Sequence, residues 1–153
     1  MIKAARAQGP VDILINNAGI GNAPALHETS DGTFDLPMEV NFGSAFRLTR
    51  VCIPGLIERR GCVLKTASVA AVSGYQRQAA YSAAKAELTG LTRNIAANYG
   101  RHGVGAHCVA PGIIRTALAE QRLSQPEFWN LIVGSTALER AGMPDDVAAA
   151  ILS

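Results

Sequence analysis

Three short apolar runs divide the chain: Val11–Ile15, Cys62–Ala67 and Val104–Val109. They are rich in β-branched and aliphatic side chains and are short, so each predicts a buried β-strand. The first run leads into Asn16-Asn17-Ala18-Gly19 and the third into Pro111-Gly112, which are turn-forming sequences. The pattern therefore predicts three strands, two of which end at well-marked turns.

Apolar residues between these runs recur three and four positions apart, which is the spacing of one face of a helix. This pattern predicts a long helix from about Phe34 to Leu56, with Pro54-Gly55 loosening its far end. An alanine-rich helix is predicted from Ala79 to Tyr99. Two weaker helices are predicted near Glu127–Val133 and Asp145–Leu152.

Strands and helices thus alternate along the chain. Such alternation favours parallel strands joined by right-handed crossovers, with helices on both faces of the sheet. We expect an α/β fold with a partial Rossmann-like, doubly wound parallel sheet. Of the 153 residues, 48% are hydrophobic and 17% charged, which suits one ordinary core, so residues 1–153 are expected to form a single domain.

Charge and composition exclude several classes of function. The net charge is +2 and no basic run is longer than Arg59-Arg60, so a nucleic-acid surface is not expected. No apolar stretch approaches the roughly 20 residues of a membrane-spanning helix. Cys52, Cys62 and Cys108 lack metal-ligand spacing, and we expect free buried thiols in a reducing cytoplasm. No metal site is expected, because the histidines do not cluster either: His27, His102 and His107.

Tyr81 and Lys85 are the pair of residues that most clearly suggests chemistry. They are four positions apart on a predicted helix, so their side chains share one face. A free phenol titrates near pH 10, and a neighbouring ammonium group favours the phenolate and brings it toward neutrality. The pair is a plausible acid/base unit.

The segment Tyr81-Ser82-Ala83-Ala84-Lys85 resembles the Tyr-x-x-x-Lys signature of the short-chain dehydrogenase/reductase family. Ser68 lies thirteen residues earlier at a strand end, where the family has its serine, and Asn41 lies where the family has a fourth catalytic residue. The turn at Asn16-Asn17-Ala18-Gly19 and the segment from Pro111 to Thr116 are also similar to family motifs. The resemblance covers nearly the whole chain.

This resemblance implies an NAD(P)-dependent oxidoreductase that moves a hydride between a nicotinamide cofactor and a small alcohol or carbonyl. Tyr81 would be the acid/base, Lys85 would assist it and bind the nicotinamide ribose, and Ser68 would hydrogen-bond the substrate oxygen. Asn41 would hold a water linking Lys85 to solvent. NAD or NADP would be bound by a set of residues at the motif positions: Asn17, Ala18, Gly19, Tyr81, Lys85, Pro111, Gly112, Ile114 and Thr116.

Some features of the family are missing from the sequence. Relatives open with a strand and a glycine-rich turn that binds the cofactor pyrophosphate, and they end with a further strand. We therefore expect this chain to be a truncated part of such a dehydrogenase, with an oligomeric intact parent and with the Val11 strand left as a hydrophobic edge. His107 and Lys65 also replace residues that are commoner in relatives.

Two alternatives to an active dehydrogenase remain. One is an inactive remnant or interaction module that retains the fold, although an intact Asn41, Ser68, Tyr81 and Lys85 argues against long decay. The other is a serine hydrolase that uses Ser68. That alternative ranks last, because Ser68 does not lie in the Gly-x-Ser-x-Gly context of doubly wound hydrolases.

Overall fold

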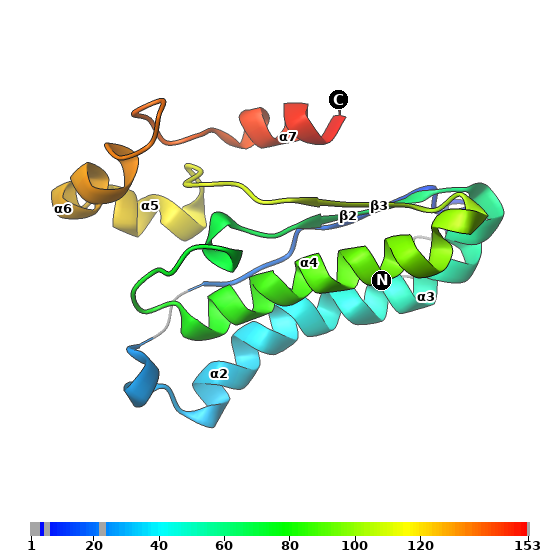
Figure 1. Cartoon of the computed structure of the whole chain (residues 1–153), viewed down its shortest axis with the longest axis horizontal. Coiled ribbons are helices and arrows are strands. Elements are labelled where there is room, and N and C mark those ends of the chain that lie inside the picture. Colours follow the sequence, from blue (N-terminus) through cyan, green and yellow to red (C-terminus); the bar gives the residue numbers. More distant parts are fainter. Residues whose placement is uncertain (1–3, 5–6, 22–23, 153) are drawn as a thin grey trace. The chain divides into compact units, whose positions relative to one another are not determined.

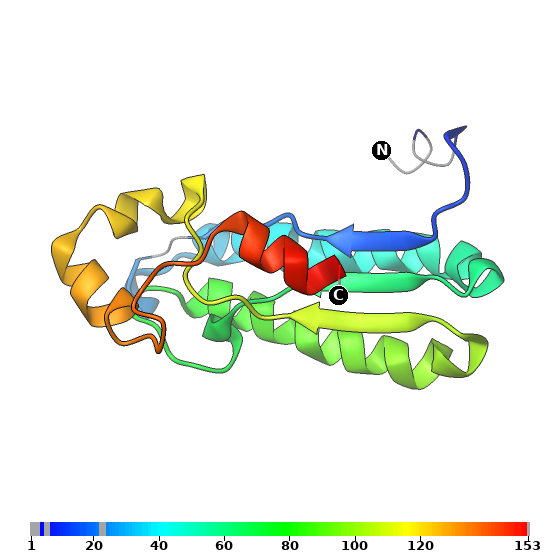
Figure 2. The ribbon, with the colours of Figure 1, turned by 90° about the horizontal axis from the view of Figure 1, so that it is seen from above.

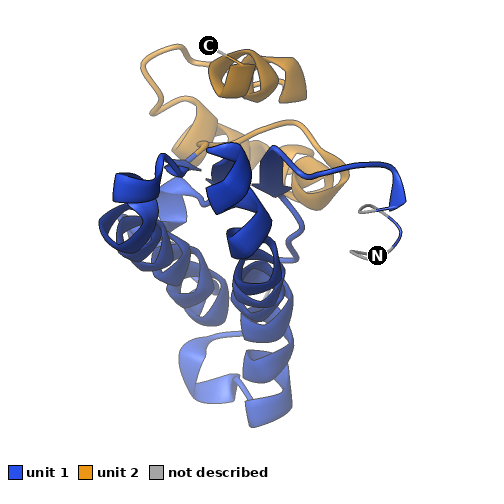
Figure 3. Ribbon diagram, turned by 90° about the vertical axis from the view of Figure 1, so that its right-hand side faces the viewer, with its two compact units in different colours: residues 1–110 blue, residues 111–153 orange. Residues whose placement is uncertain are grey.

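The computed structural model describes residue 4 and residues 7–21 and 24–152. The chain forms two compact units, residues 1–110 and residues 111–153 (Figure 3). Each unit is described by itself below.

The first unit is built on a parallel sheet of three strands. These are β1 (Ile13–Asn16), β2 (Cys62–Thr66) and β3 (Gly105–Val109), in the spatial order β1-β2-β3. The register aligns Leu14 with Val63 and Val63 with Ala106. All three predicted strands are therefore present, each shifted or shortened by one or two residues at its ends.

Two long helices connect the strands of this sheet. Helix α3 (Ser44–Arg59) leads from β1 to β2, and α4 (Ala79–Tyr99) leads from β2 to β3. Both lie against the same face of the sheet, as Figures 1 and 2 show. Consecutive parallel strands with both crossovers on one face are what right-handed connections produce. The predicted helix from Ala79 to Tyr99 is confirmed at both ends.

The helical run before β2 is longer and less regular than predicted. It begins with α2 (Asp31–Met38), whose N-cap Ser30 accepts a hydrogen bond from Thr33 N. A π-helical segment, η2 (Glu39–Gly43), joins α2 to α3, which continues past Pro54 to Arg59. The predicted start at Phe34 and end at Leu56 were therefore wrong by three residues each. Pro54 is exposed and does not end the helix.

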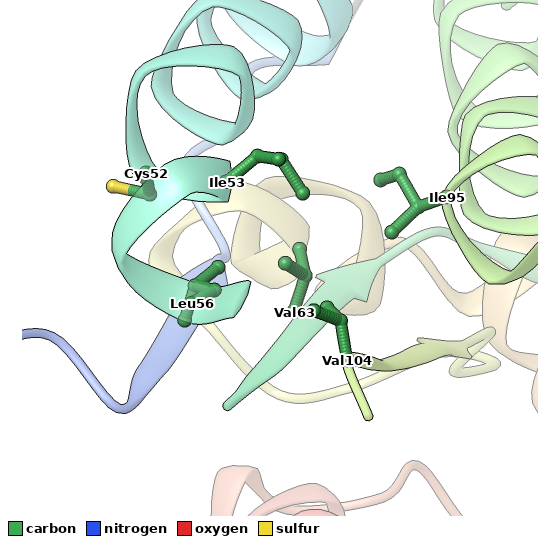
Figure 4. Close-up of a cluster of buried hydrophobic side chains, with 6 residues drawn as sticks. All are labelled: Cys52, Ile53, Leu56, Val63, Ile95 and Val104. Carbon is green, nitrogen blue, oxygen red and sulfur yellow. The ribbon is translucent and has the colours of Figure 1, made fainter. Parts of the chain in front are cut away.

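A hydrophobic cluster joins the helices to the sheet in this unit. Leu56 and Val63 are completely buried, and they pack with four other side chains drawn in Figure 4: Cys52, Ile53, Ile95 and Val104. The cluster draws on α3, β2, α4 and the residue before β3. Three consecutive residues of β2 are buried, Val63, Leu64 and Lys65, as expected for the central strand of a parallel sheet. Short 3₁₀ turns complete the unit at Leu26–Glu28, Val69–Ala71 and Gly100–His102.

The second unit is smaller and mainly helical. It contains α5 (Ala117–Leu123), α6 (Pro126–Phe128), a π-helical segment (Trp129–Val133) and α7 (Pro144–Leu152). Its own core consists of Leu123, Val133 and Ala141. The two weak helices predicted here are present, but α5 was missed. Over the part of the chain that the structure describes, no helix is both long and apolar enough to cross a membrane.

Candidate active site

The predicted site residues of the first unit gather around the turns that follow β1 and β2. Asn16 ends β1 as a buried residue, and its side-chain amide donates a hydrogen bond to Thr49 Oγ1 on α3 at 3.2 Å. The next three residues, Asn17, Ala18 and Gly19, are exposed. The chain thus leaves the core at the carboxyl end of the sheet, which is where doubly wound folds bind ligands.

Asn41 ties this turn to the helical run. It is 1% exposed and lies in the π-helical segment η2. Its Oδ1 accepts from Ile20 N at 3.0 Å, and its amide donates to Ile20 O at 2.9 Å and to Pro37 O at 2.8 Å. Both amide hydrogens are therefore used by backbone carbonyls. A water held by this side chain would therefore donate to the second lone pair of Oδ1 rather than accept from the amide.

Lys85 projects from α4 to the end of β2. It is 4% exposed, and its Nζ donates a hydrogen bond to Thr66 O at 2.7 Å. Burial lowers the pKa of Lys85 below its ordinary value, and the nearby Cys108 opposes this shift. An ammonium has three donors, so two are left unused by the described residues and can serve a ligand oxygen or another partner.

Gly19 lies where Asn41 and Lys85 converge. A Cβ placed on Gly19 would lie 2.7 Å from Asn41 Oδ1 and 3.2 Å from Lys85 Nζ. The structure therefore brings together three of the predicted residues, which come from the turn after β1, from η2 and from α4.

Tyr81 and Ser68 complete the predicted set in this unit. Tyr81 is half-buried one turn before Lys85, and the Lys85 ammonium lies 5.7 Å from the centre of its ring. Ser68 follows β2 two residues after Thr66, and its Oγ accepts a hydrogen bond from Ala70 N at 3.1 Å. Ser68 thus caps the short turn at Val69–Ala71. The hydroxyl hydrogen of Ser68 stays available for a bond to another acceptor.

The remaining predicted cofactor residues belong to the second unit. Pro111 and Ile114 are half-buried, whereas Gly112 and Thr116 are exposed. Ile114 forms a parallel bridge with Gly142, and Thr116 immediately precedes α5. These residues form the segment that leads into the first helix of their unit.

The sequence marks Lys65 as unusual for the family but does not predict its burial. Lys65 on β2 is 0% exposed, and its Nζ has no hydrogen-bond partner among the described residues. Its register neighbours are Asn16 on β1 and Cys108 on β3. The Oδ1 of Asn16 is likewise buried without a partner. A lysine inside a run of strand residues was the available sequence signal.

Free thiols are present as predicted, but they are less deeply buried. Cys52, Cys62 and Cys108 are unpaired, and only Cys52 is fully buried. Cys62 lies on β2 and Cys108 on β3, and both are half-buried. Within the described residues, no cluster of three or more metal-ligating side chains occurs.

Comparison with known proteins identifies the fold. A family model described as enoyl-(acyl carrier protein) reductase matches residues 1–153. A solved oxidoreductase of the short-chain dehydrogenase/reductase family, from Burkholderia thailandensis, is 32% identical, with a TM-score of 0.88 over 97% of this chain and 59% of that one. The chain belongs to the short-chain dehydrogenase/reductase family. The Rossmann-like fold predicted from the sequence is thereby confirmed.

Several members of this family resemble the chain along its whole length. An inactive 2-(S)-hydroxypropyl-CoM dehydrogenase 2 from Xanthobacter autotrophicus is 36% identical, over 99% of this chain and 68% of the relative. A 4-hydroxyisoleucine dehydrogenase complexed with NADH is 31% identical, with a TM-score of 0.91 over 99% of this chain and 63% of that one. A gluconate 5-dehydrogenase from Burkholderia cenocepacia in complex with NADP and tartrate is 28% identical, with a TM-score of 0.92 over 97% and 59%.

The chain is short for this family of oxidoreductases. It spans between 57% and 68% of the length of the curated relatives and between 59% and 63% of the solved chains. The 4-hydroxyisoleucine dehydrogenase structure holds NADH, and the gluconate 5-dehydrogenase structure holds NADP.

Proposed function

We propose that this chain carries the acid/base half of an NAD(P)-dependent oxidoreductase acting on a small alcohol or carbonyl. The observation that carries the proposal is the buried Lys85 ammonium, which donates a single hydrogen bond among the described residues and lies beside the Tyr81 ring. Burying a lysine that still has free donors is unfavourable unless a ligand or another partner takes them up. A ribose hydroxyl and a phenol oxygen are suitable acceptors.

Each of the four proposed catalytic residues would have a distinct task. A bound nicotinamide cofactor supplies or accepts the hydride at the substrate carbon. Tyr81 exchanges a proton with the substrate oxygen, and the charge on Lys85 stabilises negative charge on the phenol oxygen. Ser68 donates its hydroxyl hydrogen to the substrate oxygen. Asn41 holds the turn after β1 against η2, as its three hydrogen bonds indicate.

The residues proposed to hold the cofactor are compatible with this role. Asn17, Ala18 and Gly19 are exposed, so a ligand can reach them, and Gly19 lies beside Lys85. In the second unit, Pro111, Gly112, Ile114 and Thr116 are proposed on the family motif alone. Both NAD and NADP are proposed, because one solved relative holds NADH and another holds NADP.

The test is a fluorescence titration of the purified chain with NADH and with NADPH, followed by an absorbance assay of alcohol oxidation. We expect saturable binding of at least one nucleotide. Tyr81→Phe is expected to lower kcat by roughly 10² to 10⁴ while leaving nucleotide affinity within a few-fold, because the lost hydroxyl acts on the substrate proton. Tyr75→Phe is the matched control, since Tyr75 is a half-buried tyrosine in the loop before α4.

The second candidate function is that of an inactive or partner-binding chain that retains the fold. The relative from Xanthobacter autotrophicus that is named inactive shares 36% identity with this chain. An inactive or partner-binding chain would bind neither nucleotide, and Tyr81→Phe would then change no measured property. That pair of results would replace the oxidoreductase proposal with this one.

A further inference from the structure

The environment of Gly19 is more restrictive than that of a simple turn residue. A Cβ at this position would lie 2.7 Å from Asn41 Oδ1, a separation that real Cβ contacts essentially never show, and 3.2 Å from Lys85 Nζ. The backbone of Gly19 does not require glycine, because its φ lies outside the positive region. Glycine is therefore required here by the lack of room for a side chain and not by the backbone conformation.

The two groups that occupy this space are held unequally. Three hydrogen bonds fix the Asn41 carboxamide to Ile20 and Pro37, whereas Lys85 makes a single one, to Thr66 O, within the part of the chain that the structure describes. Asn41 Oδ1, which carries partial negative charge, and Lys85 Nζ both border the position that a Cβ of Gly19 would take. A carbonyl dipole directed at an ammonium favours its charged form.

We propose that Gly19 is a positioning residue for Lys85. Its bare Cα leaves the space in which the Asn41 carboxamide and the Lys85 ammonium approach each other, and this sets where Nζ stands beside Tyr81. The proposal rests on the proposed function for its catalytic meaning, because Lys85 is the group that serves Tyr81 and the cofactor.

Gly19→Ala changes this arrangement in a defined direction. The added methyl group displaces Asn41 Oδ1 from the ammonium and shields Nζ from polar contacts. Both effects disfavour the charged form, so the pKa of Lys85 is expected to fall further, by at least about half a pH unit. Two titratable groups lie near Lys85, namely Cys108 on β3 and Tyr81 one turn earlier on α4, and Gly19→Ala replaces neither of them.

The experiment is a ¹³C NMR titration of the chain labelled at the lysine Cε. The sequence has only Lys3, Lys65 and Lys85, so three signals are assigned with single Lys→Arg variants. The matched control is Gly74→Ala, a loop glycine around which nothing lies within 4 Å of a Cβ. Gly74→Ala is expected to leave the Lys85 midpoint unchanged.

A double-mutant cycle with Asn41→Ala separates positioning from general disruption. If Gly19 acts through Asn41, the shift caused by Gly19→Ala shrinks by at least about half in the Asn41→Ala background. An unchanged Lys85 midpoint in a folded Gly19→Ala variant overturns the proposal, as does an additive cycle. If Gly19→Ala does not fold, folding of the double variant supports the collision with Asn41, and its failure to fold overturns it.

This readout needs no cofactor. A chain that binds neither NADH nor NADPH but shows the Lys85 shift refutes the proposed function and leaves the positioning role of Gly19 intact. A chain that binds nucleotide but shows no Lys85 shift refutes the positioning role of Gly19 and leaves the proposed function intact.

Discussion

Two buried lysines in the first unit have different surroundings. Lys85 donates a hydrogen bond to Thr66 O, whereas Lys65 has no partner for its Nζ among the described residues. Burial lowers the pKa of Lys65 to about 8, and the neighbouring Cys108 and Cys62 oppose the shift. A charged amine held in this position opposes folding, because the unfolded chain would hydrate it.

Replacing Lys65 with methionine is expected to stabilise the chain. Methionine keeps most of the volume and removes the amine that must be desolvated. At pH 7 we expect the free energy of unfolding to rise by roughly 2 to 3 kcal/mol, which is the order of magnitude that the lowered pKa implies. Urea denaturation of the two proteins at pH 7 measures the difference.

The pH dependence of stability gives a second check on Lys65. Its folded pKa of about 8 lies below the ordinary value of 10.5, so between these limits the unfolded chain binds more protons. The free energy of unfolding therefore rises with pH across this window, and Lys65 destabilises the fold most below it. The difference between wild type and Lys65→Met should shrink by pH 10. Equal stability of the two proteins at pH 7 would contradict this account.

At the scale of elements, two glycines near the end of α3 should respond in opposite ways to alanine. Gly55 lies within the helix and nothing is within 4 Å of a Cβ there. Gly61 lies between α3 and β2, where a Cβ would collide with the backbone carbonyl of Asp12. The same carbonyl accepts the hydrogen bond of Cys62 N that begins the pairing of β1 with β2.

Gly55→Ala is expected to raise the free energy of unfolding by roughly 0.5 to 1 kcal/mol, because glycine loses more backbone entropy in a helix. Gly61→Ala is expected to lower it by more than about 2 kcal/mol, since backbone cannot move as a flexible side chain can. Thermal unfolding followed by circular dichroism measures both. A loss of stability in Gly55→Ala, or none in Gly61→Ala, would show that the helix-to-strand junction differs from the one described.

Two elements of the structure were not predicted from the sequence, and each omission has a physical reason. Helix α5 buries only Leu123 while Leu118 is 54% exposed, so it has no apolar face for periodicity to reveal. The π-helical segment at Glu39–Gly43 adds one residue to a turn, which a pattern of three and four positions cannot resolve. The start of α2 did carry a readable signal, the N-cap Ser30.

For the molecule as a whole, the spacing of the motifs predicted which residues meet at the site, but it did not predict their hydrogen bonds. Asn41, Gly19 and Lys85 come from segments far apart in sequence. The parallel order of the strands brings them together at the carboxyl end of the sheet. Their hydrogen bonds to Ile20, Pro37 and Thr66 use backbone atoms, which leave no trace in the sequence. The burial of Lys65 was also hidden, because a lysine is ordinarily a surface residue.

The three-stranded sheet leaves β1 at one edge among the described residues. Ile13 is 63% exposed and Ile15 is 49% exposed on this strand. An apolar edge strand promotes pairing with another chain. We expect the average mass in sedimentation velocity to increase with concentration, and Ile15→Lys to weaken this association. A concentration-independent mass, or association that is unaffected by Ile15→Lys, would contradict a role for β1.

The burial of Lys65 and Lys85 also determines how the chain meets an endoprotease that cleaves after lysine. These two residues lie in β2 and α4 and are 0% and 4% exposed, while Lys3 falls outside the described residues. Cleavage at either internal site therefore requires the first unit to open. When opening is fast relative to cutting, the digestion rate at Lys65 and Lys85 follows the population of opened molecules. Limited proteolysis would thus report the stability of the first unit separately from that of the second, whose sequence contains no lysine.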